Sequence, residues 1–87
     1  MREFKPPEAF IINGRILQDI LDESSPEQPV NLRCAEIPGV NLTDVLLQEA
    51  DLWGAKLTHA CLNNANLKGA YLMRSSLIGA EMRGAIL

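Results

Sequence analysis

The stretch ADLWG AKLTH ACLNN ANLKG at residues 50–69 decides the fold, because it repeats one five-residue unit four times. Each unit begins with alanine and carries leucine at its third position. The same spacing runs without a break from Val30 to the end of the chain. The third positions are Leu32, Ile37, Leu42, Leu47, Leu52, Leu57, Leu62, Leu67, Leu72, Leu77, Met82 and Leu87. The first positions are Val30, Ala35, Val40, Val45, Ala50, Ala55, Ala60, Ala65, Ala70, Ser75, Ala80 and Ala85.

A period of five residues fits neither a regular helix nor a flat strand. On a helix, successive leucines would step by roughly 140° and never form one apolar face. On a strand, side chains alternate with a period of two, so a step of five would change faces each time. We therefore expect the chain to turn a corner at every pentad. Four pentads then close a square coil of about twenty residues, and coils stack at the strand spacing of ~4.8 Å. Strand twist favours a right-handed coil.

Several pentads carry a more specific signature. Ala50-Asp51-Leu52-Trp53-Gly54, Ala65-Asn66-Leu67-Lys68-Gly69 and Ala80-Glu81-Met82-Arg83-Gly84 resemble the A-(D/N)-L-x-x unit of the pentapeptide-repeat family. The resemblance covers residues 30–87 and implies an all-β solenoid: a right-handed quadrilateral parallel β-helix of about three coils. A minority of that family mimics DNA and acts on type II topoisomerases, which makes such an activity one expectation for this chain.

The first 29 residues lack the pentad pattern and form a separate segment. Ile16, Leu17, Ile20 and Leu21 recur at helical spacing, which predicts a short helix near residues 14–23 with Asn13 as its N-cap. The alternative is a hairpin that turns at Asn13-Gly14. In either form the segment is apolar enough to cap the open end of the first coil, which would otherwise expose strand edges. We thus divide the chain into a capping segment, 1–29, and a repeat domain, 30–87.

The composition argues for a small non-catalytic domain. No apolar run is long enough to span a membrane, and the first residues do not form a signal peptide, so we expect a cytoplasmic protein. Cys34 and Cys61 fall on different coils and are expected to be free thiols. His59 lies at an outward corner without partner ligands for a metal. We expect no catalytic residues, no cofactor, no metal, no small-molecule substrate and no membrane partner.

The distribution of charged residues tests the expectation that the chain mimics DNA and acts on a type II topoisomerase. Residues 30–87 contain five acidic and five basic residues, so the repeat domain is neutral, and the net charge of −3 lies entirely in the first 29 residues. A DNA mimic needs an extended acidic face, because DNA carries one negative charge per ~1.7 Å of its axis. Nucleic-acid binding would need a basic stripe, which the sequence also lacks. Both activities are therefore disfavoured.

One outward face of the coil gathers residues that are common at protein interfaces. Residues twenty apart lie above one another, so Arg33, Trp53 and Met73 form one column, beside Asn31, Asp51 and Tyr71. We call Arg33, Asp51, Trp53, Tyr71 and Met73 the Trp53 face, and expect a cation–π contact between Arg33 and Trp53. The face could be covered by the N-terminal segment, could bind a partner protein, or could be an idle exposed aromatic patch.

The last residues of the sequence continue the apolar repeat without a cap. Met82, Ile86 and Leu87, which we call the C-terminal rim, belong to this final coil. The rim could pair with a second copy to give a homodimer, or the repeat could continue into further coils. Otherwise the rim could remain exposed to solvent or bind a different protein. The sequence as a whole favours a non-catalytic protein–protein interaction or scaffold module of unidentified partner. The alternative is a DNA-mimicking protein that acts on a type II topoisomerase.

Overall fold

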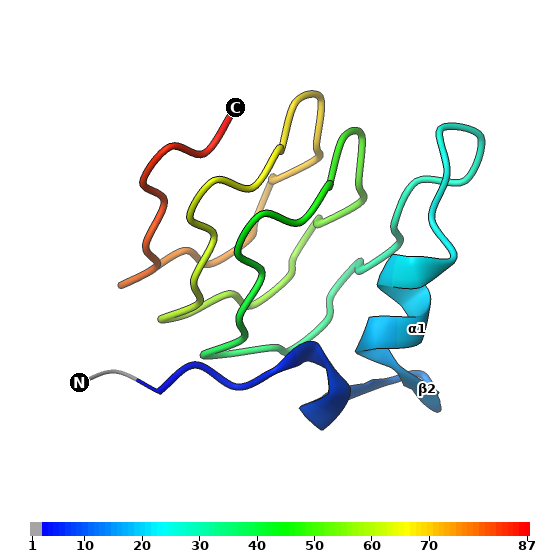
Figure 1. The fold of residues 1–87 in the computed structure, drawn as a ribbon, viewed down its shortest axis with the longest axis horizontal. Coiled ribbons are helices and arrows are strands. Elements are labelled where there is room, and N and C mark those ends of the chain that lie inside the picture. The colour runs from blue at the N-terminus through cyan, green and yellow to red at the C-terminus, as the bar shows by residue number, and fades with distance from the viewer. Residues whose placement is uncertain (1–2) are drawn as a thin grey trace.

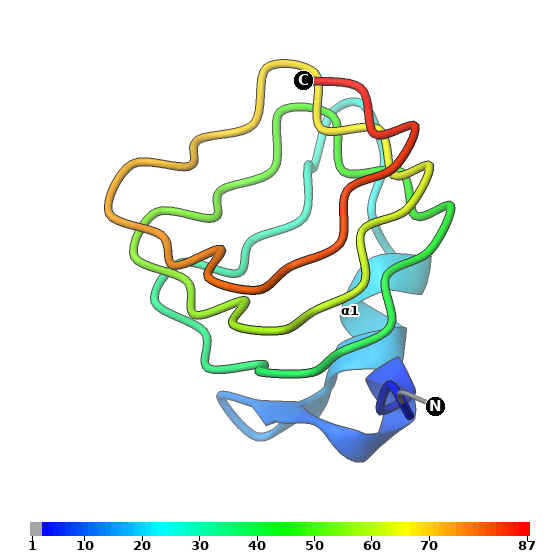
Figure 2. The same ribbon diagram turned by 90° about the vertical axis from the view of Figure 1, so that its left-hand side faces the viewer.

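The repeat region winds into stacked coils in the computed structural model, which describes residues 3–87. Figures 1 and 2 show the loops lying one behind another, with α1 at one end of the stack and the C-terminus at the other. Parallel bridges join residues twenty apart on four sides: Asn31–Asp51–Tyr71, Glu36–Lys56–Ser76, Asn41–Cys61–Glu81 and Leu46–Asn66–Ile86. The predicted coil of twenty residues is thus the repeating unit of the structure.

Each side of a coil holds only one bridged residue, because a turn follows immediately. The amide of Leu52 donates to the carbonyl of Tyr71 at 2.9 Å, and the amide of Tyr71 donates to the carbonyl of Ala50 at 2.9 Å. Three residues after each core leucine, a backbone amide bonds back across the turn, as from Ala55 to Leu52 at 3.0 Å. Coils are therefore tied by isolated bridges rather than by long strands.

The interior of the stack contains the two predicted phases of the repeat. Core leucines from Leu32 to Leu67 are at most 2% exposed, and the alanines between them at most 6%. Leu72, Leu77 and Met82 in the last coil are only partly buried, since no described residue covers them from beyond. Because leucine side chains and small alanine side chains fill the coil, its axis is a packed core.

Acidic and amide residues at the second pentad position have a structural role. The side-chain Oδ1 atoms of Asn31, Asn41, Asp51 and Asn66 each accept a hydrogen bond from the backbone amide two residues later, at 3.1–3.2 Å. Such Asx turns pre-form the bend that follows. This local bond explains why Asp and Asn recur at that position.

The N-terminal segment combines both structures that its sequence allows. A 3-10 helix, η1 (Pro7–Ala9), precedes two short antiparallel strands, β1 (Ile11–Ile12) and β2 (Arg15–Ile16), and then helix α1 (Leu17–Asp22). The prediction of Asn13 as an N-cap was wrong: Asn13 and Gly14 form the hairpin turn, with φ of 51° and 80°. The helix begins at Leu17 instead of residue 14, because the turn uses the residues that would have formed its first winding.

Two contacts attach this segment to the first coil. Leu17 is fully buried and belongs to the same core cluster as the leucines of the coils, and Phe10, Ile12, Ile20 and Leu21 pack against that cluster. Lys5 forms a parallel bridge with Val40, donating to the carbonyl of Gly39 and accepting from the amide of Asn41, both at 2.8 Å. The segment therefore continues both the core and one edge of the first coil.

Candidate functional site

The Trp53 face is assembled by the stacking of three successive coils. The bridges from Asn31 to Asp51 and from Asp51 to Tyr71 place these residues above one another. In the neighbouring column, the amide of Gly54 donates to the carbonyl of Met73 at 2.9 Å, which fixes Met73 above Trp53. The five residues chosen from the sequence thus lie on one side of the solenoid.

Asp51 organises the lower part of this face through both of its carboxylate oxygens. Its Oδ1 accepts a hydrogen bond from the backbone amide of Trp53 at 3.1 Å. Its Oδ2 lies 3.7 Å from a terminal guanidinium nitrogen of Arg33. The guanidinium of Arg33 in turn lies 4.2 Å from the centroid of the Trp53 ring. The cation–π contact expected from the twenty-residue spacing is therefore present, and Trp53 is held in place from below.

The upper part of the face is open to solvent. Tyr71 is 64% exposed and Met73 is 70% exposed, whereas Trp53 is partly buried. Residues 3–29 of the N-terminal segment do not cover these two side chains. The segment pairs instead with the edge beside Asn41, two sides round the coil from the Trp53 face. The aromatic and thioether surface is thus available for contact.

Arg74 is a member of this site that the sequence analysis missed. Its guanidinium carbon lies 5.9 Å from the centroid of the Trp53 ring. Arg74 sits at a corner, with φ of 61°, and corner side chains do not follow the simple in-and-out alternation of the pentad. The available signal was its position directly after Met73 and one coil above Gly54, whose missing side chain leaves room beside Trp53.

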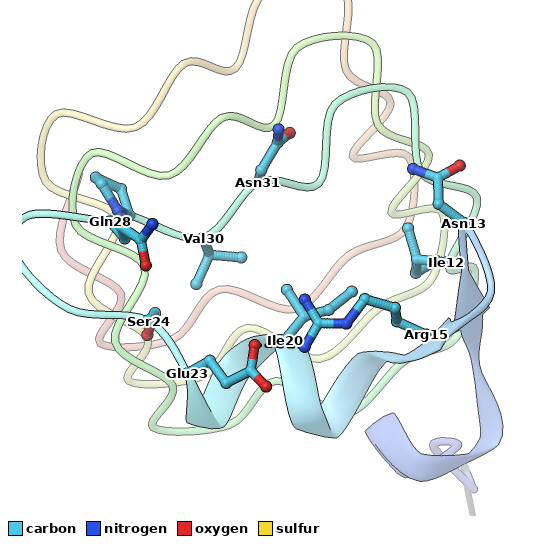
Figure 3. A pocket seen from close by; sticks show the side chains of 10 residues that line it. Ile12, Asn13, Arg15, Ile20, Glu23, Ser24, Gln28, Val30 and Asn31 are labelled. Atoms are coloured by element: carbon cyan, nitrogen blue, oxygen red, sulfur yellow. Dashed lines mark hydrogen bonds and ion pairs between the residues drawn. The ribbon is translucent and has the colours of Figure 1, made fainter.

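A separate cleft of about 390 Å³ lies where the N-terminal segment meets the first coil. Figure 3 shows its lining, in which the guanidinium of Arg15 and the carboxylate of Glu23 point toward each other and Ile12, Ile20 and Val30 are among the walls. The carboxylate of Glu23 accepts a hydrogen bond from Arg15 and forms an ion pair with it, and this bond and charge raise the pKa of Arg15. Because its two charged groups satisfy each other, the cleft offers no free charge to a ligand.

The C-terminal rim presents apolar side chains at the other end of the stack. Ile86 is 51% exposed and Leu87 is 75% exposed, while Met82 is partly buried. In the earlier coils, outward carbonyl and amide groups form hydrogen bonds with the next coil. The equivalent groups of this last coil, such as the carbonyl of Ala70 and the amide of Leu72, have no backbone partner among residues 3–87. The rim is thus an open sheet edge on an apolar core.

The described residues, 3–87, contain no group of three or more His, Cys, Asp or Glu side chains arranged to hold a metal ion. Cys34 and Cys61 are free, the first exposed and the second buried. His59 lies at an exposed corner. Across the same described range, no helix has the length and apolar character needed to cross a bilayer.

Comparison with known proteins finds matches that share the five-residue repeat. The family model for pentapeptide repeats matches residues 30–64 and 50–87. Among solved structures, the chain is similar to the pentapeptide repeat protein Rfr23 from the cyanobacterium Cyanothece 51142, with 35% identity and a TM-score of 0.62. It is also similar to HetL, a pentapeptide repeat protein involved in heterocyst differentiation regulation from the cyanobacterium Nostoc sp. strain PCC 7120, with 36% identity and a TM-score of 0.56.

These matches cover 64% and 66% of this chain but only 39% and 30% of the respective relatives, so the chain spans less than half the length of either. No curated protein matches the chain. The structural likeness implies a right-handed β-helix, as the sequence led us to expect.

Proposed function

The chain belongs to the pentapeptide repeat family, and we propose that it works as a non-catalytic protein–protein interaction module. The observation that carries the proposal is the Trp53 face, where Trp53 is held by Arg33 beside the exposed Tyr71 and Met73. Tryptophan, tyrosine and arginine are the residue types that most often dominate binding energy at interfaces. An aromatic side chain that is already fixed loses little conformational freedom when a partner binds.

The alternative of DNA mimicry has less support. The repeat domain carries five acidic and five basic residues, and the most distinctive face brings two guanidinium groups close to Trp53. A surface that replaced DNA would need carboxylates at these places. HetL is involved in the regulation of heterocyst differentiation; a regulatory role of that kind is compatible with a module that acts by binding.

Affinity purification with matched variants tests the proposal. A partner that co-purifies with the wild-type chain should be lost with Trp53→Ala and retained with Leu46→Ala, because Leu46 is 65% exposed but lies on a different side. Trp53→Ala should lower the free energy of unfolding by only about 1 kcal/mol, through the lost contact with Arg33. If Trp53→Ala unfolds the chain, Tyr71→Ala replaces it. Equal recovery of the partner by all variants would contradict the proposal.

The C-terminal rim supports a second proposal, association of two copies of this chain. The carbonyl of Ala70 and the amide of Leu72 have no partner within the described residues, and the side chain of Leu87 is 75% exposed. A sheet edge above an apolar core tends to pair with another edge. A homodimer through this rim would cover both features at once.

A further inference from the structure

Two guanidinium groups approach the ring of Trp53, but only one of them is neutralised. The guanidinium of Arg33, from the first coil, lies 4.2 Å from the ring centroid, and that of Arg74, from the third coil, lies 5.9 Å from it. Arg33 has Asp51 as its ion-pair partner at 3.7 Å. Among residues 3–87, no carboxylate forms an ion pair with Arg74.

Asp51 forms its ion pair with Arg33 and forms none with Arg74, so its charge is matched by Arg33. Oδ1 accepts from the amide of Trp53, and Oδ2 faces Arg33. Asp51 is also the one acidic residue in the two columns that form this side of the solenoid, the other five being Asn31, Arg33, Trp53, Tyr71 and Met73. Counted over these two columns and the corner that follows them, the charges of Arg33, Asp51 and Arg74 sum to one net positive charge beside the Trp53 ring. Glu49, at the corner that precedes the columns, forms no ion pair with Arg74.

The free charge borders the most exposed apolar surface of the face. Tyr71 and Met73 are 64% and 70% exposed, and Arg74 follows Met73 directly in the chain. A ligand that fits both features has a carboxylate next to an apolar side chain. A single net charge matches one or two carboxylates, whereas nucleic-acid binding normally uses several phosphate contacts.

We propose that the Trp53 face binds an acidic peptide segment of its partner protein. A glutamate or aspartate of that segment pairs with Arg74, and a neighbouring apolar side chain packs against Trp53, Tyr71 and Met73. The inference rests on the proposed function and specifies the partner's chemistry. A bidentate arginine–carboxylate pair adds geometric specificity as well as energy. The charge also accelerates encounter and rejects basic segments.

Trp53 fluorescence measures this binding directly, since Trp53 is the only tryptophan of the chain. The probes are three acetylated and amidated peptides, GELEG, GQLQG and GKLKG, titrated at low ionic strength. The glutamate peptide should give a saturable change, with an affinity roughly fivefold or more above that of the glutamine peptide. The lysine peptide should bind more weakly still, and added salt should reduce the glutamate peptide's advantage.

Matched variants distinguish a specific contribution of Arg74 to binding from the effect of the chain's overall charge. Arg74→Gln should remove the preference for glutamate over glutamine, whereas Arg83→Gln removes the same charge from another side of the same coil and should leave that preference in place. Arg74→Gly should also lose the preference while keeping the fold, because glycine readily adopts the φ of 61° found at this corner. A loss of affinity in Arg74→Gly with an unchanged melting temperature therefore reports binding rather than unfolding.

Three results would overturn the inference. Equal affinity for GELEG and GQLQG would show that the face binds through apolar contact alone, which leaves the proposed function intact. The absence of a saturable change with GELEG would remove the acidic segment as the ligand, while the purification test with Trp53→Ala would still decide the proposed function. Tighter binding of a short oligothymidylate than of GELEG would assign the face to single-stranded nucleic acid, whose bases stack on aromatic side chains.

Discussion

The corner residue of each pentad has a left-handed backbone, whichever side chain it carries. Positive φ occurs at Gly39, Gly54, Gly69, Gly79 and Gly84, and also at Cys34, Asp44, Glu49, His59, Asn64 and Arg74. Where a large corner side chain lies one coil below, the corner above it is often glycine. His59 below Gly79 is the closest case: a methyl group at Gly79 would lie 2.2 Å from Nδ1 of the His59 ring.

Gly79→Ala is therefore expected to destabilise the chain more than Gly39→Ala. The two glycines have nearly the same φ, 70° and 71°, but a methyl group at Gly39 would meet nothing within 4 Å. Gly39→Ala should cost about 1–2 kcal/mol through its left-handed backbone, and Gly79→Ala should cost this amount plus the displacement of His59. Urea unfolding of both variants measures the difference.

A double-mutant cycle checks the cause. In a His59→Ala background the imidazole is gone, so Gly79→Ala should cost no more than Gly39→Ala. An unchanged cost in that background would show that the backbone, and not the imidazole, limits this corner.

The residues that could be predicted from the sequence are those whose position in the pentad determines whether the side chain points into or out of the coil. Core leucines, and the column of Arg33 and Trp53, follow from the five- and twenty-residue spacings alone. The same twenty-residue spacing places Glu36 below Lys56, and their side chains form an ion pair at 3.1 Å. Arg74 could not be found this way, because a corner side chain can lean toward either adjoining side of the coil.

At the scale of elements, the N-terminal segment was harder to predict because its local signals overlap. Asn13 suits both an N-cap and a hairpin turn, and propensity alone does not separate them. The turn exists because Asn and Gly adopt positive φ readily, and α1 then begins where the apolar Leu17 can enter the core. The start of the helix is therefore determined by contact with the coil, whose residues follow later in the sequence than the hairpin.

Leu17→Ala tests whether this segment and the coils unfold together. Leu17 is fully buried, so its truncation should cost about 2–5 kcal/mol. The neighbouring Ile16 is 40% exposed and serves as the control, with a much smaller expected loss for Ile16→Ala. Urea unfolding followed by Trp53 fluorescence and by circular dichroism should shift to the same lower midpoint in Leu17→Ala. If the Trp53 transition did not move, the segment would be an appendage rather than part of the folding unit.

At the scale of the whole molecule, the two ends of the stack differ. The first coil is contacted by Leu17 and Lys5. On each side of the last described coil, by contrast, outward backbone groups have no backbone partner among residues 3–87. On the side of Tyr71 these are the carbonyl of Ala70 and the amide of Leu72, and the other three sides repeat the pattern. Two such edges related by a two-fold axis run antiparallel, so each carbonyl faces the other copy's amide. The edge is therefore complementary to itself.

A protein of these 87 residues is accordingly expected to form a homodimer through the C-terminal rim, and Leu87→Glu should convert it to a monomer. The substitution removes an apolar side chain from the interface and places like charges near each other across the two-fold axis. Leu46→Glu is the matched control, because Leu46 is 65% exposed and lies in the first coil.

The interface is limited by the cross-section of one coil, so the wild-type dimer should dissociate on dilution. Sedimentation velocity over a range of concentrations measures this: wild type and Leu46→Glu should show a concentration-dependent dimer, and Leu87→Glu should stay monomeric with an unchanged circular dichroism spectrum. A wild-type monomer at every concentration would rule out the homodimer and leave the open edge to a further coil or to a different protein.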